Sequence, residues 1–188
     1  MRKFLFFPTA CVLLFLVSCK ASEPPVPYRP TATIKDIMDS HVDPSAEYIW
    51  ESVATIITEK GIEERFPRTA KEWQELRRRA ITLVEATNLM IMPGRLVAHP
   101  GEKSENPGIE LAPEEINALL EKDRATFVKH ALELHDTALV MLNAIDAKDK
   151  DKILDSGAAI DEACENCHKI YWYPNEGKGI TPVPSQQK

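Results

Sequence analysis

Residues 149–171 read DKDKILDSGAAIDEACENCHKIY, and this stretch decides the fold. Its apolar and small residues recur at intervals of three or four positions, at Ile153, Gly157, Ile160, Cys164, Cys167 and Tyr171. That interval places them on one face of an α-helix. Charged residues fill many of the positions between them. The stretch therefore predicts an amphipathic helix that begins near Asp149 and buries its apolar face against other elements.

Three earlier segments carry the same spacing, within residues 33–60, 69–92 and 113–145. The first is expected in two pieces, because Asp43 precedes Pro44 and is therefore driven out of the helical region. The third is expected as one helix of about eight turns. No segment alternates apolar and polar residues as a strand does. The sequence predicts an all-α fold, an antiparallel four-helix bundle over residues 33–174.

The N-terminal end predicts export and tethering. A basic start precedes an apolar run over residues 4–17, which is too short to span a bilayer with margin. Leu16-Val17-Ser18-Cys19 then resembles the lipobox of bacterial lipoproteins. We expect residues 1–18 to be a lipoprotein signal peptide and Cys19 to be the lipidated first residue of the mature chain. A retained membrane anchor, or cleavage without lipidation, is the alternative.

The segments that flank the predicted bundle are expected to be irregular. Residues 19–32 are rich in proline and should form an extended stalk, and residues 175–188 should form a flexible tail. Residues 93–112, rich in Pro-Gly pairs, are either a functional loop or a simple crossover. Lipidation at Cys19 would hold the domain on the periplasmic side of a bacterial membrane, and Lys20 favours the outer membrane. The net charge of −6 disfavours nucleic acid as a partner.

Cys164-Glu165-Asn166-Cys167-His168 has the spacing C-x-x-C-H. Two thiols three residues apart on a helix point the same way, so both can reach the vinyl groups along one edge of a porphyrin. His168 follows the second thiol and is placed to coordinate the iron. The motif therefore predicts one covalent haem c, with thioethers at Cys164 and Cys167 and His168 as the proximal ligand.

Other uses of a paired-cysteine motif fit this sequence less well. A structural zinc site needs further Cys or His ligands at suitable spacing, and the chain has no second pair. A thioredoxin-type pair belongs to a βαβ context that the sequence does not predict. A disulfide between residues three apart in a helix would be strained.

With this motif on its last helix, the chain resembles the cytochrome c-prime type of four-helix-bundle c-type cytochrome. The likeness covers roughly residues 31–173, and it rests on the helix layout, the motif and short phrases such as Ile37-Met38-Asp39-Ser40. The resemblance implies that the first helix covers the distal face of the haem. Tyr171-Trp172-Tyr173-Pro174 would then form an aromatic cap beyond the motif.

The distal side of the haem separates two functions in that family. Members with a methionine on the first helix are low-spin electron carriers, and Met38 lies at the corresponding position, which makes it the expected distal iron ligand. Members with an open distal side bind NO or CO. Met38 as a plain core residue, or His41 as the ligand, stays open as an alternative. The other histidines, His99, His130 and His135, are not favoured as ligands, although His135 borders the apolar stripe.

Together these features predict a monohaem carrier that moves one electron between periplasmic or membrane redox proteins. It is not expected to be an enzyme, since the chain has no phosphate-binding loop, no G-x-S-x-G and no H-E-x-x-H. A five-coordinate, gas-binding cytochrome is the first alternative, and a haem-relay subunit of a larger membrane complex is the second. The resemblance also implies that two copies can pair through the first and second predicted helices, within residues 33–60 and 69–92. Candidates for contacts with the haem propionates are Arg77, Arg78, Arg79 and Arg95.

Overall fold

A computed structural model describes residues 28–175. The predicted signal peptide, Cys19, and most of the predicted stalk and tail lie outside this range, so those predictions stand untested. The described chain is mainly helical, as the sequence predicts. Its elements in order are α1 (Ile34–Ile37), the π-helical segment η1 (Met38–Val42), α2 (Asp43–Ser52), β1 (Ala54–Thr58), β2 (Gly61–Arg65), α3 (Ala70–Met90), α4 (Pro113–Lys122), α5 (Arg124–Ala147) and α6 (Lys150–Tyr171).

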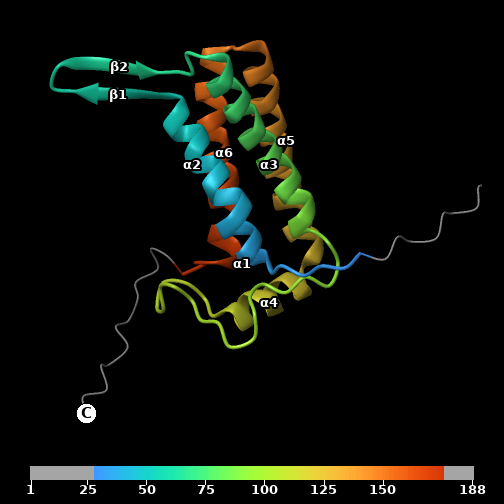
Figure 1. Cartoon of the computed structure of the whole chain (residues 1–188). Coiled ribbons are helices and arrows are strands. Elements are labelled where there is room, and N and C mark those ends of the chain that lie inside the picture. The colour runs from blue at the N-terminus through green and yellow to red at the C-terminus, as the bar shows by residue number, and fades with distance from the viewer. Residues whose placement is uncertain (1–27, 176–188) are drawn as a thin grey trace, which may run out of the picture.

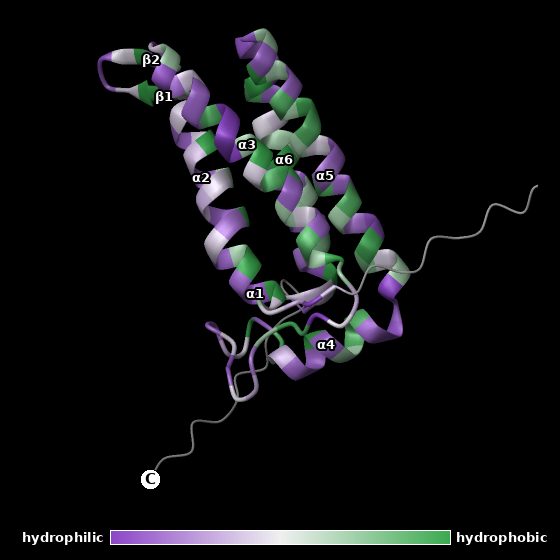
Figure 2. Ribbon diagram, turned by 45° about the vertical axis from the view of Figure 1, so that its right-hand side comes forward, coloured by the Kyte–Doolittle hydropathy of each residue, from purple (hydrophilic) through white to green (hydrophobic). Residues whose placement is uncertain are grey.

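The long helices lie side by side (Figure 1). Helix α3 packs against α2 and α5, and α6 packs against α5 and α2, so the four enclose one core. Leu76, Leu83, Met141 and Ile160 in that core are fully buried. Green and purple residues mix along each helix in Figure 2, as expected for amphipathic helices that bury one face. No helix in the described range is long and apolar enough to cross a membrane.

The prediction of a chain without strands is wrong at residues 54–65. These residues form an antiparallel hairpin in which Ile57 of β1 pairs with Ile62 of β2. The isoleucines after Val53 continue the helical spacing, but Val, Ile and Thr dominate this run, and β-branched residues favour extended backbone. Gly61, with φ of 123°, follows the turn and takes a conformation that suits glycine. The first helix therefore ends at Ser52.

The third predicted helix is two helices. Asp123, with φ of −137°, ends α4 and caps α5, because its carboxylate accepts a hydrogen bond of 3.1 Å from the Thr126 N–H. Helix α4 then crosses the lower ends of the other helices in Figure 1. Residues 93–112 run along the same end, where the Leu111 N–H donates to the Trp172 carbonyl at 2.8 Å. This connection thus covers one end of the helices.

Candidate functional site

All four residues predicted to hold the haem line one cavity of about 30 Å³. Met38 reaches it from η1, and Cys164, Cys167 and His168 reach it from α6. The remaining lining is mostly apolar, and it comprises Val42, Asp43, Met90, Phe127, His130, Ala131, Leu134 and Ala163. Residues from the two ends of the described chain are thus brought to the same place, on segments that the sequence predicted to face one another.

Each of the two segments is fixed by a capped helix start. Thr33 and Asp36 form a reciprocal capping box at the start of α1, in which the Thr33 N–H donates to the Asp36 carboxylate at 2.7 Å. The main-chain N–H of Ile34 also donates to Leu96, at 2.9 Å, which ties this start to the loop of residues 93–112. Asp149 caps α6 by accepting from the Lys152 N–H at 3.2 Å. These contacts set the positions of Met38 and of the cysteine motif.

The two cysteines are free thiols in a mostly buried setting. Burial raises the pKa of the Cys164 thiol to about 12, and the nearby Asp43 carboxylate adds to the shift. Burial likewise raises the pKa of Cys167 to about 12. Redox-active cysteine pairs depend on a lowered thiol pKa, so this environment is the opposite of the one that a thioredoxin-type pair requires.

His168 is oriented by a tyrosine and a carboxylate behind it. The Tyr173 hydroxyl lies 3.3 Å from His168 Nδ1 and donates a hydrogen bond to Glu165. That hydrogen bond lowers the pKa of the Glu165 carboxyl. Because Nδ1 faces these groups, Nε2 is the ring nitrogen available to a metal. Carboxylate-linked partners of this kind fix the tautomer and ring orientation of ligating histidines.

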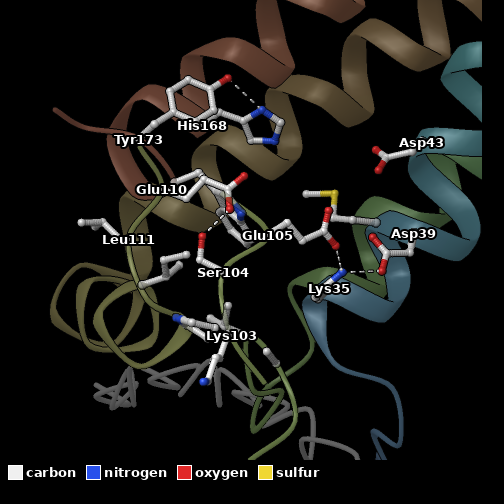
Figure 3. A pocket seen from close by; sticks show the side chains of 16 residues that line it. Lys35, Asp39, Asp43, Lys103, Ser104, Glu105, Glu110, Leu111, His168 and Tyr173 are labelled. Atoms are coloured by element: carbon white, nitrogen blue, oxygen red, sulfur yellow. Dashed lines mark hydrogen bonds and ion pairs between the residues drawn. The ribbon is translucent and has the colours of Figure 1, made fainter. Parts of the chain in front are cut away.

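A second cavity of about 200 Å³ adjoins the first, since Met38, Asp43 and His168 line both. Figure 3 shows His168 and Tyr173 on one wall and Lys35, Asp39 and Asp43 on the other. The loop of residues 93–112 closes the lower side with polar residues. Lys35 joins this loop to α1 through ion pairs with Asp39 at 2.7 Å and Glu105 at 2.6 Å. The smaller cavity is therefore lined mainly by apolar residues, and its neighbour has a mixed lining that includes several charged side chains.

The four arginines proposed for the propionates line neither cavity. Arg77 pairs with Asp146 at 2.6 Å on the surface. Arg78 and Arg79 both pair with Glu75 on their own helix. Arg95 donates to the Leu89 carbonyl at 2.8 Å, and its pKa is lowered by burial. The lysines that do line the larger cavity are Lys35 and Lys103.

Two further polar residues line the cavity: His130, which was not favoured as a ligand from the sequence, and Asp43, which was not predicted as a site residue. His130 lines it with its side chain only 12% exposed and with Nδ1 at 2.8 Å from Glu133. Asp43 lines it as well, and the surrounding protein raises the pKa of its carboxyl. The remaining histidines point elsewhere: His41 contacts Ser40, His99 pairs with Asp36, and His135 pairs with Asp136. None of these three lines the cavity.

The donor set fits a haem of c type. A thiol pair at i and i+3, an imidazole beside it and a thioether from another segment are all present, and apolar side chains surround them. The cavity is smaller than a porphyrin ring, so its lining side chains must shift when the ring enters. Among residues 28–175, no cluster of three or more His, Cys, Asp or Glu side chains is arranged to hold a bare metal ion.

Comparisons with known proteins assign no family. A scan against protein-family models found no match, and searches of the curated proteins and of the solved structures found none either.

Proposed function

We propose that this protein is a monohaem c-type cytochrome, built as a four-helix bundle of the cytochrome c-prime type, that carries one electron at a time. Its haem would be bound covalently through Cys164 and Cys167. The carrier would be exported and tethered through a lipid on Cys19 to the periplasmic side of a bacterial membrane. Redox proteins of that compartment would be its partners.

The observation that carries the proposal is the convergence of Met38 with Cys164, Cys167 and His168 on one apolar cavity. Only the three motif residues are close in sequence. Met90 also lines the cavity, from the end of α3, so Met38 is singled out by its place on the first helical segment rather than by residue type alone. The raised thiol pKa values argue against a redox-cycling pair, because redox-active cysteines depend on a lowered thiol pKa.

The residues have distinct roles in this proposal. A bound haem supplies the redox centre, and the chain supplies its ligands and surroundings. His168 offers Nε2 to the iron, with Tyr173 and Glu165 holding its ring. Met38 offers a thioether, which favours the ferrous state and so raises the reduction potential. The apolar lining excludes water, so little solvent reorganisation accompanies a change of charge.

Absorption spectra of the matured protein, oxidised and reduced, test this assignment. We expect covalent haem, a low-spin spectrum, a near-infrared methionine–iron band and no response to CO. Met38→Ala should abolish the band. Met90→Ala is the matched control, because Met90 lines the same cavity without belonging to the proposed ligand set, and it should retain the band.

The other outcomes separate the alternatives. A high-spin spectrum that changes on addition of CO or NO would replace the electron carrier with a gas-binding cytochrome. A stable complex with a membrane enzyme after mild solubilisation would favour the haem-relay subunit. Absence of haem after expression with the c-type maturation machinery would refute the proposal as a whole, as would haem retained in a Cys164→Ser/Cys167→Ser double variant after denaturation.

A further inference from the structure

The hairpin of β1 and β2 projects from the helices near the end opposite to α4 (Figure 1). Two of its three isoleucines are unusually exposed: the solvent-accessible fraction is 84% for Ile57 and 73% for Ile62. They pair in register and therefore lie on the same face of the ribbon. A two-stranded ribbon without further packing is marginally stable in water, and three or more strands are usually needed. The hairpin thus has the properties of a sheet that is completed by another chain.

The two strands differ in charge. β2, Gly61-Ile62-Glu63-Glu64-Arg65, carries three charged residues, which is how natural proteins protect an exposed sheet edge from pairing. β1, Ala54-Thr55-Ile56-Ile57-Thr58, carries no charged residue and no proline. In the described range β1 pairs only with β2, so its outer edge has no strand beside it. The edge of β1 is therefore the one suited to strand addition.

We propose that β1 pairs antiparallel with β1 of a second copy of this chain, which makes a four-stranded sheet in the order β2-β1-β1-β2. The sequence of β1 is compatible with itself. In a pairing centred on Ile56, Thr55 of one copy lies opposite Ile57 of the other, and Ala54 lies opposite Thr58. No like charges meet. The same arrangement of two β2 strands would set Glu63 against Glu63, which is unfavourable.

This pairing also covers the exposed isoleucines. Ile57 of each copy lies diagonally across from Ile57 of the other on one face of the sheet, within reach for side chains of this size. With Ile62 beside it in each copy, four isoleucines come together. A membrane surface suits the hairpin less well, because five charged side chains flank the isoleucines and would be costly to bury in lipid, namely Glu59, Lys60, Glu63, Glu64 and Arg65. The inference does not depend on the haem, since no residue of the hairpin lines the haem cavity.

Disulfide crosslinking of the full matured chain in mild detergent tests the pairing. Directly opposite residues of antiparallel strands have Cβ atoms about 4.5–5.5 Å apart, close enough for a disulfide after a small adjustment. Ile56→Cys should give a reducible dimer on mild oxidation. The matched control is Glu63→Cys. Glu63 lies on β2 and pairs with Ile56 within the same chain, so this variant should stay largely monomeric. The unsubstituted chain, oxidised in parallel, shows any crosslink that arises from its own cysteines.

Analytical sedimentation of the same protein without crosslinking measures how strongly the two copies associate. Ile57→Lys should weaken dimerisation at least about tenfold, because two lysines would then meet near the centre of the new sheet. Glu63→Lys should not weaken it, and circular dichroism should stay unchanged for both, since the hairpin lies outside the core. A chain that is monomeric at all concentrations would overturn the proposal. So would equal crosslinking at residues 56 and 63, or vesicle binding by a monomer that is lost in Ile57→Lys.

Discussion

Gly157 in the middle of α6 provides a quantitative test of how α2 and α6 pack. A Cβ added at this residue would lie 3.5 Å from Cδ1 of Trp50 and 4.0 Å from Cε of Met141, which are ordinary van der Waals distances. A glycine in a helix interior costs about 0.5–1 kcal/mol relative to alanine. Since the methyl group fits, Gly157→Ala should raise the free energy of unfolding by about 0.5–1 kcal/mol. A glycine that looks required for close packing is expected to be dispensable.

Thermal and urea unfolding of the matured protein measure this change. For a chain of this size the melting temperature should rise by about 1–4 °C, with an unchanged urea m-value. Ala159→Gly is the control, because Ala159 is exposed on the same helix and reports the backbone preference alone. It should lower stability by a similar amount. Gly157→Val should destabilise the protein, because its γ-methyl groups would enter the space held by Trp50 and Met141.

A loss of more than about 1 kcal/mol in Gly157→Ala would refute this reasoning, since overpacking costs of that size arise when a methyl group has no room. It would mean that α2 and α6 lie closer than the structure has them. The indole N–H of Trp50 donates to the Gly157 carbonyl at 3.1 Å, so this contact fixes the separation of the two helices. The same separation determines how far η1 stands from His168, and the result therefore bears on the proposed site.

Four further predictions concern other parts of the molecule. Tyr173→Phe removes the hydroxyl beside His168 and should raise the reduction potential by on the order of tens of millivolts in a redox titration, because a lost hydrogen bond makes the imidazole a poorer donor. Thr33→Ala should cost about 1 kcal/mol in urea unfolding as a lost helix cap. The hydrogen bonds from Thr33 lower the pKa of Asp36, so its carboxylate stabilises the fold above its unfolded pKa of about 3.9 and loses that effect as pH falls through the lower folded value. Asp36→Asn should therefore destabilise the protein at pH 7, and by progressively less as the pH is lowered below the unfolded pKa. Arg95→Met should cost about 2 kcal/mol in the same assay, since it leaves buried carbonyls unpaired, and should leave the haem spectrum unchanged.

The helical pattern and the cysteine motif were readable from the sequence because both depend on local spacing. Residues of α6 at intervals of three and four do form its buried face, and Ile153 and Ile160 are almost fully buried. The start of α3 depends on local spacing too, since Thr69 and Glu72, three residues apart, form a reciprocal capping box. The shared cavity of Met38 and the motif was predicted from the resemblance and from the apolar stripe. Apart from this cavity, which joins η1 to α6, these features depend on neighbours in sequence or on one face of one helix.

The features that were missed depend on competition between local signals. Residues 53–58 satisfy a helical spacing and a β-branched composition together, and the composition decided the outcome. At Asp123 the apolar stripe misses one turn, because Asp123 and Arg124 stand between Leu120 and Phe127, but it resumes in phase, so the spacing alone did not separate two helices. The break arises because the Asp123 side chain caps a new helix. An aspartate three residues before Thr126 was a signal that could have been used.

The helix break expected at Asp43-Pro44 does not occur, because the backbone stays helical through both residues. A proline inside a helix has no N–H to donate and crowds the carbonyl four residues earlier. Here the chain stays helical and widens into the π turn η1, in which the Asp43 N–H donates to the Met38 carbonyl. In an unbroken α-helix, residues five apart point about 140° away from each other. The wider turn brings Met38 and Asp43 to the same side, and both line the cavity. π turns of this kind recur at functional sites. The Asp43-Pro44 pair, which a helical pattern treats as an interruption, is therefore the feature that explains why a carboxylate lies beside the proposed distal ligand.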